Sequence, residues 1–112
     1  MTSAPGVDIH FPIGQVYEAI IGSDHFLLRF DSNTSMHQTG VVGPNKGFSE
    51  TETIAVTPLR SGVFLVTWQE SSGTTVVQVQ DFEQETVYTH ITIPDDDGTV
   101  FLRFEGTLKR VE

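Results

Sequence analysis

The stretch from Gly62 to Leu108 constrains the fold most, because it contains four β-rich runs separated by three turn signals. The runs are rich in valine, isoleucine, threonine and aromatic residues, and the turns include Ser-Ser-Gly and Pro-Asp-Asp-Asp-Gly. A new strand begins after roughly 8–12 residues, a spacing typical of an antiparallel sheet that curls into a barrel or a sandwich. The stretch therefore predicts an all-β fold.

The first half of the chain continues this pattern more weakly. We expect a hairpin formed by Gln15–Ile21 and Phe26–Phe30, followed by a short edge strand at Ser35–Val42. A further strand with alternating side chains is expected at Ser49–Thr57, ending at Pro58. No window shows the 3.6-residue apolar period of a helix. We therefore predict a single small antiparallel up-and-down β-barrel with seven to eight strands and little or no helix.

The first hairpin also suggests a register. If Ile21 lies opposite Phe26, Glu18 lies opposite Arg29, and an opposite-charge pair of this kind suits the solvent side of a sheet. The apolar face of the hairpin is then formed by Tyr17, Ala19, Ile21, Phe26, Leu28 and Phe30.

Length and composition indicate one domain without disulfide cross-links. The chain has 112 residues and no cysteine, which excludes disulfides and thiolate metal sites. We expect residues 1–14 to be a leader segment and residues 15–112 to be the barrel domain.

The charge balance limits the possible partners. Six basic and fifteen acidic residues give a formal net charge of −9, which would repel a phosphate backbone, so nucleic-acid binding is not expected. The first residues lack the basic start and apolar run of a signal peptide, and no apolar stretch approaches the roughly 18 residues of a membrane span. These features predict a cytoplasmic protein with no membrane association.

The three turns of the second half predict a register in which the opposed pairs are Glu70–Thr75, Asp81–Thr86 and Pro94–Thr99. In this register one sheet face combines large aromatic residues with a few charged ones, as a small-molecule site requires. The ligand-binding candidates on this face are Phe64, Trp68, Glu70, Tyr88, His90, Phe101 and Arg103.

The alternative is that this charged face lies outside the barrel and that the other face is the dry core. A slip of one residue at a turn would exchange the two faces. Singly, Trp68 is most often a core residue and His90 a hydrogen-bonded structural histidine.

General acid–base chemistry is the one enzyme class that these residues favour. Glu70, His90 and Glu105 are the catalytic candidates, with Arg103 holding an anionic group of the substrate. The four histidines lie far apart without an HxH or HExxH pattern, so no metal site is expected.

Four short motifs carry a resemblance to a known family, and they are Trp68-Gln-Glu70, Asp81-Phe-Glu83, Tyr88-Thr-His-Ile91 and Phe104-Glu-Gly-Thr107. In this order they resemble the MoaF-related small proteins, over about residues 12–111. The resemblance implies a lipocalin-like (calycin-type) barrel with a central cavity, and it implies no settled activity. Other small calycin barrels are binding proteins, and some are cofactor-free decarboxylases, isomerases or cyclases.

Together these observations predict a protein that binds a small, partly apolar molecule, anionic or aromatic, in the barrel cavity, without a cofactor. One alternative is a cofactor-free acid–base enzyme that uses Glu70, His90 and Arg103. A second alternative is a structural scaffold that forms a homodimer through one packed face.

Overall fold

The computed structural model describes residues 10–111, and these residues contain nine β-strands and no helix. The strands are β1 (Val16–Ile21), β2 (Asp24–Ser32), β3 (Ser35–Val42), β4 (Ser49–Thr53), β5 (Ala55–Arg60), β6 (Val63–Gln69), β7 (Thr75–Asp81), β8 (Thr86–Asp95) and β9 (Gly98–Val111).

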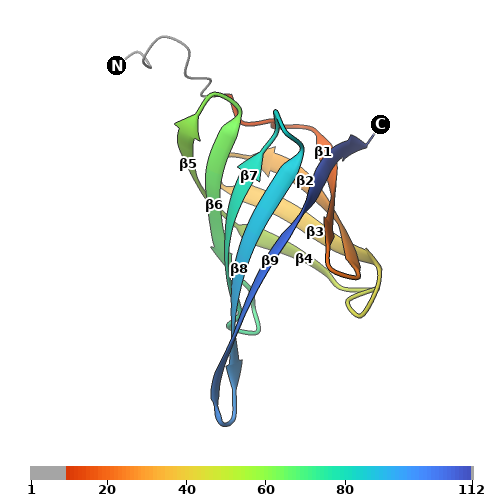
Figure 1. The fold of residues 1–112 in the computed structure, drawn as a ribbon, viewed down its shortest axis with the longest axis vertical. Helices are drawn as coiled ribbons and strands as arrows, with labels where there is room; N and C mark the ends of the chain where they lie inside the picture. Colours follow the sequence, from red (N-terminus) through yellow and green to blue (C-terminus); the bar gives the residue numbers. More distant parts are fainter. Residues whose placement is uncertain (1–9, 112) are drawn as a thin grey trace.

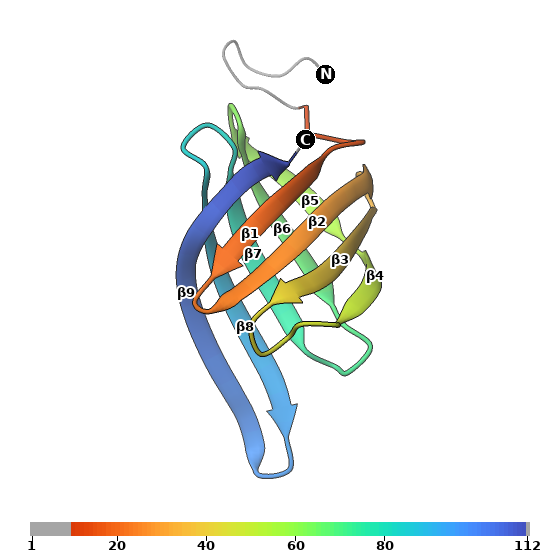
Figure 2. The ribbon, with the colours of Figure 1, turned by 90° about the vertical axis from the view of Figure 1, so that its right-hand side faces the viewer.

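All nine strands belong to one antiparallel sheet in the order β4-β3-β2-β1-β9-β8-β7-β6-β5. Strands that follow one another in the sequence pair with one another in most of the sheet, and pairing of β1 with β9 joins the two halves. The sheet curls so that β1–β4 lie across the interior from β5–β8 (Figure 1, Figure 2). The predicted all-β up-and-down barrel is confirmed, in a nearly closed form.

The strand count was predicted too low, because Ser49–Thr57 is two strands and not one. The chain turns a corner at Ile54, whose side chain is buried and whose backbone N–H donates to the carbonyl of Thr34. Before this corner the chain pairs with β3, and after it the chain pairs with β6. Pro58 does not end the second strand, because β5 is an edge strand in which a residue without an N–H is tolerated.

The register of the first hairpin differs from the prediction by two residues. Ala19 lies opposite Phe26, because the turn is shortened to Gly22-Ser23, with Gly22 at a φ of 60°. A shift of two residues keeps every side chain on its predicted face, so the apolar face of the hairpin still points into the core. The expected pairing of Glu18 with Arg29 is wrong: Glu18 contacts His25, and Arg29 binds Asp31.

The register between β6 and β7 differs by one residue, with larger consequences. Gln69, not Glu70, lies opposite Thr75, because a five-residue loop connects the strands. This loop is closed by a hydrogen bond from the Glu70 N–H to the carbonyl of Thr74. The other two turns have the predicted registers, with Asp81 opposite Thr86 and Pro94 opposite Thr99. The inner face of β6 was therefore assigned correctly, whereas the assigned faces of β7–β9 are exchanged.

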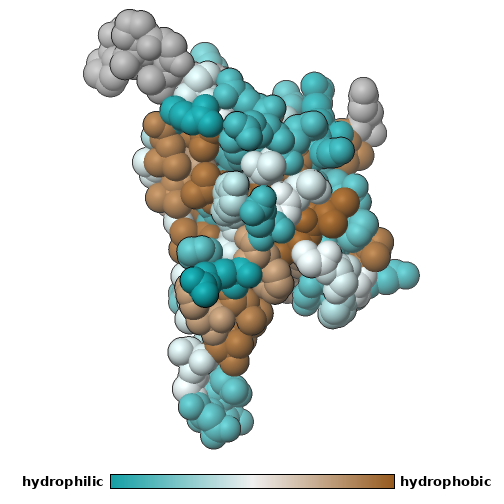
Figure 3. Space-filling model, viewed as in Figure 1, coloured by the Kyte–Doolittle hydropathy of each residue, from teal (hydrophilic) through white to brown (hydrophobic). Residues whose placement is uncertain are grey.

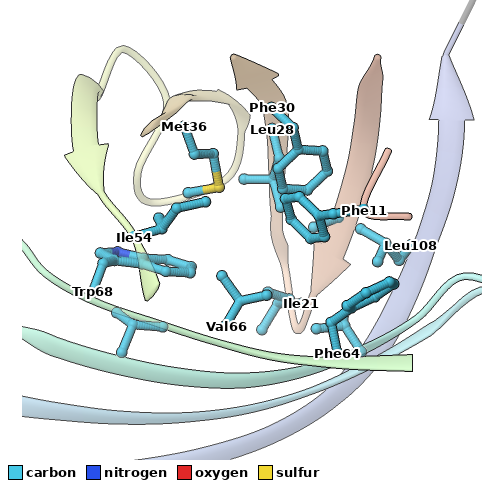
Figure 4. Close-up of a cluster of buried hydrophobic side chains, with 13 residues drawn as sticks. Phe11, Ile21, Leu28, Phe30, Met36, Ile54, Phe64, Val66, Trp68 and Leu108 are labelled. Atoms are coloured by element: carbon cyan, nitrogen blue, oxygen red, sulfur yellow. The ribbon is translucent and has the colours of Figure 1, made fainter. Parts of the chain in front are cut away.

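Buried hydrophobic side chains form the core of the barrel (Figure 4), and at one end, which we call the plugged end, aromatic rings cluster together. Phe11 precedes the first strand, and its ring centroid lies 4.7 Å from that of Phe30 and 5.2 Å from that of Phe64. Phe82 and Tyr17 complete the cluster, with ring centroids 4.8 Å apart. Edge-to-face contacts of this kind add to the free energy gained from burying the rings.

We predict that Phe11→Ala lowers the free energy of unfolding by about 3 kcal/mol, because it removes a buried ring from this cluster. Ile13→Ala is the matched control on the same segment: its side chain is 47% exposed, so its change should stay within about 0.5 kcal/mol. Urea denaturation measures both values. Equal losses in the two variants would show that Phe11 does not anchor this end of the barrel.

Candidate functional site

A partly enclosed cavity of about 230 Å³ lies at the other end of the barrel, which we call the open end. The β1–β2, β3–β4 and β6–β7 turns approach its rim, contributing Asp24, Asn45 and Thr74 to the lining. Most of the wall is apolar, and it is formed by Ile21, Phe26, Phe48, Trp68, Val76, Ile91, Ile93, Leu102 and Phe104. Gln38 and Glu70 add polar groups to this wall.

The polar groups converge on one carboxylate. Glu70 Oε2 accepts a hydrogen bond from the Trp68 indole N–H at 3.1 Å and a second from the Gln38 amide at 2.9 Å. Trp68 and Glu70 meet because they are two residues apart and therefore share one face of β6 and its continuation. The indole is 5% exposed, so its ring forms cavity wall while its N–H is satisfied by Glu70.

Gln38 connects this carboxylate to a second one. Its amide nitrogen donates to Glu52 Oε2 and to Glu70 Oε2, at 2.9 Å in each case. Because both partners are carboxylate oxygens that accept from the amide nitrogen, they fix the orientation of the amide. Gln38 and Glu52 are both almost fully buried, on the inner faces of β3 and β4.

The two glutamates of β4 differ in their protonation. Burial raises the pKa of Glu52 from 4.5 to about 7, and the neighbouring Glu50 and Glu70 carboxylates act in the same direction. The hydrogen bond from Gln38 opposes this shift. Glu50 has a lowered pKa, because the Ser71 hydroxyl and backbone N–H both donate to its carboxylate. Near neutral pH, Glu52 can therefore exchange a proton while Glu50 stays ionised.

The interior contains some of the predicted ligand-binding residues. Trp68 and Glu70 line the cavity as expected. Phe64 is also inside, but it packs in the aromatic cluster of the plugged end and does not line the cavity.

The remaining predicted site residues are placed on the outer face of the sheet, so their expected position in the interior is wrong. His90 lies opposite Arg103 and Tyr88 opposite Glu105, as predicted, but these pairs point to solvent. Phe101, which is 58% exposed, packs against the His90 ring and beneath the Arg103 guanidinium. These residues lie outside because the register between β6 and β7 differs by one residue from the predicted register.

Figure 3 shows hydrophobic side chains on the molecular surface around the β8–β9 hairpin. Exposed apolar residues of these strands include Tyr88, Val100 and Phe101. The alternative interpretation, in which the face bearing Tyr88 and His90 lies outside, is thus the correct one for β7–β9.

The sequence interpretation missed Gln38, Glu50 and Glu52. The sequence does contain a pattern that predicts the position of the glutamates. Glu50 and Glu52 lie four and two residues before Ile54, which is buried, so the three side chains point to the same face of a strand. This phase places both carboxylates on the inner face. Gln38 is likewise in phase with the buried Met36.

Two structural features are absent from residues 10–111. Within this range no group of three or more histidine, aspartate or glutamate side chains is arranged to hold a metal ion. The same residues include no helix with the length and apolar character needed to cross a membrane.

Comparison with known proteins supports the fold. A family model described as MoaF-like matches residues 13–109. A crystal structure described as "a putative beta-lactamase from Burkholderia vietnamiensis" superposes with a TM-score of 0.81 at 24% identity, covering 93% of this chain and 100% of that chain. At this identity the likeness extends to the fold alone. No curated protein matches the sequence.

We predict that the stability of the protein depends on pH through Glu52. Its folded pKa of about 7 lies above the ordinary 4.5, so the folded state holds the proton more tightly and the free energy of unfolding falls as pH rises between these values. Glu52→Gln should remove this loss and be more stable than the parent at pH 8, by about 3 kcal/mol, with little difference near pH 4.

Urea denaturation across this pH range measures the effect. Glu105→Gln, the same change on the exposed outer face, is the control and should follow the parent at each pH. A difference between Glu52→Gln and the parent that is constant with pH would contradict the assignment.

Proposed function

The chain belongs to the MoaF-like family, and from this premise together with the geometry of the cavity we propose that it binds a small, partly apolar molecule inside the barrel. The single observation that carries the proposal is the cavity at the open end. Ligand sites combine an apolar wall with a few convergent polar groups. Here the apolar wall faces a hydrogen-bonded group formed by Trp68, Glu70 and Gln38.

The dimensions of the cavity limit the ligand. Sites for drug-sized molecules span about 300–1,000 Å³. The cavity here measures about 230 Å³, which favours a molecule of one or two rings, or a short chain of similar volume. Four aromatic residues in the wall, Phe26, Phe48, Trp68 and Phe104, favour a flat body.

The polar groups refine the predicted ligand. Arg103, which was expected to hold an anionic group, lies on the outer face of β9. Neither lysine nor arginine occurs in the cavity lining, whereas Asp24 and Glu70 both do. An anionic ligand would therefore meet like charge, and an uncharged or cationic one fits better.

A second candidate function is cofactor-free acid–base catalysis on the bound molecule. One observation favours it: Glu52, with a pKa of about 7, is connected through the Gln38 amide to the Glu70 carboxylate at the cavity wall. A group that titrates near neutral pH suits proton transfer. In this version Glu70 contacts the substrate, and His90 and Glu105 take no part.

We predict that Val76→Phe weakens binding of the neutral two-ring fluorophore 1-naphthalenemethanol at least tenfold. Val76 is buried and lines the cavity, so the added ring occupies the space of the ligand. Val77→Phe is the matched control, because the next residue points to the outer face and is 37% exposed. Its affinity should equal that of the parent.

The readout is the emission of the probe and the quenching of Trp68, which is the single tryptophan of the chain. Native mass spectrometry of gently purified parent protein, before and after denaturation, tests for a small molecule that copurifies with the protein. Failure of the probe to bind the parent, with a clean mass of the protein alone, would reject the cavity as a binding site. Equal weakening by both variants would reject it too.

A further inference from the structure

We propose that the ligand is an organic cation, in which an ammonium group binds at Glu70 and a flat apolar body lies against the aromatic wall. This inference rests on the proposed function, because it names the chemical class of the molecule that occupies the same cavity. It is carried by the charges of the lining, by the hydrogen bonds of Glu70 and by the aromatic side chains beside it.

The charges of the lining have one sign. Asp24 and Glu70 are its charged residues, and the described basic side chains lie elsewhere. Arg29 pairs with Asp31 on the outer face of β2, and Arg60 pairs with Asp81 and Glu83 near the plugged end. Arg103 lies on the outer face of β9. The charged residues of the lining are thus both acidic, so they repel an anion and attract a cation.

Glu70 has a free position for such a group. Its Oε2 atom is held by the indole of Trp68 and the amide of Gln38, whereas Oε1 has no hydrogen-bond partner within residues 10–111. Both donors are neutral, so they orient the carboxylate without cancelling its charge. An ammonium group donates hydrogen bonds and carries the opposite charge, and such charge-assisted bonds are about twice as strong as neutral ones.

The aromatic residues beside Glu70 suit the same group. Trp68 lies two residues before Glu70, and Phe26, Phe48 and Phe104 complete the aromatic part of the wall. The face of an aromatic ring attracts a cation, and tryptophan does so most strongly. Aromatic rings together with a carboxylate form the combination that recognises ammonium compounds, whereas a purely neutral ligand would leave the Glu70 charge uncompensated.

A matched series of probes tests the inference. 1-Naphthylmethylamine, 1-naphthalenemethanol and 1-naphthoate share one ring system and differ in charge, and the amine is protonated at pH 7.5. We expect the amine to bind at least tenfold more tightly than the alcohol, and the carboxylate to bind least. Isothermal titration calorimetry at two salt concentrations measures the affinities, with the preference for the amine reduced at high salt.

Two variants assign the preference to its residue. Glu70→Gln should abolish the advantage of the amine while the alcohol still binds, which also shows that the variant is folded with its cavity intact. Glu105→Gln removes the same charge from the exposed outer face and should keep the preference of the parent. If both variants reduce the preference equally, the net charge of the protein is responsible, and Glu70 is not the site.

The outcomes separate the two proposals. Equal binding of the amine and the alcohol to the parent would overturn the cation inference and leave the proposed function standing. Tightest binding of the carboxylate would overturn the inference in the same way. No binding of any of the three probes would overturn both.

Discussion

The barrel depends on side-chain hydrogen bonds at its seam between β4 and β5, where no backbone hydrogen bonds join neighbouring strands. The edge strands β4 and β5 leave the sheet open between them, and β4 faces β6 across this gap. Gln38 crosses the gap to Glu70, and Glu50 crosses it to Ser71 in the β6–β7 turn. These bonds hold the β6–β7 turn against β3 and β4. They therefore fix both the closure of the barrel and the position of the polar groups of the cavity.

The same contacts couple the fold to the chemistry of the site. The carboxylate of Glu70 is at once a partner across the gap and part of the cavity wall. Burial raises the pKa of its neighbour Glu52 to about 7, and the Glu50 and Glu70 carboxylates act in the same direction. The charge of Glu70 therefore contributes to the proton affinity of Glu52.

The fold was largely predictable because its evidence is local. Turn residues and alternating apolar side chains identified most strands, and the Asp81–Thr86 and Pro94–Thr99 registers follow from turns whose length the sequence defines well. The Ser71-Ser72-Gly73 turn does not define its own length, because loops of four and five residues both accommodate it. A difference of one residue there exchanged the inner and outer faces of β7–β9, moving His90 and Arg103 to the surface.

The site was less predictable because it assembles residues from distant parts of the sequence. Trp68 and Glu70 were recognised as cavity residues from the alternation of β6 alone. Their partners Gln38 and Glu52 reach them through the closure of the barrel, which depends on the corner at Ile54. No local pattern specifies that corner, since Ser49–Thr57 alternates without interruption.

The burial of Glu52 has a cost in stability. An apolar residue of similar size at this position would pack inside the barrel without a desolvation cost, and replacing buried charged groups in this way often stabilises a protein. The chain instead holds three glutamates near one another, although its formal net charge is already −9. Two of these glutamates stabilise the fold, because Glu50 and Glu70 accept the hydrogen bonds that close the barrel, whereas the burial of Glu52 opposes stability. Under the proposed function it is Glu70 that presents its charge to the bound molecule, and departures from local rules of stability are expected at such sites.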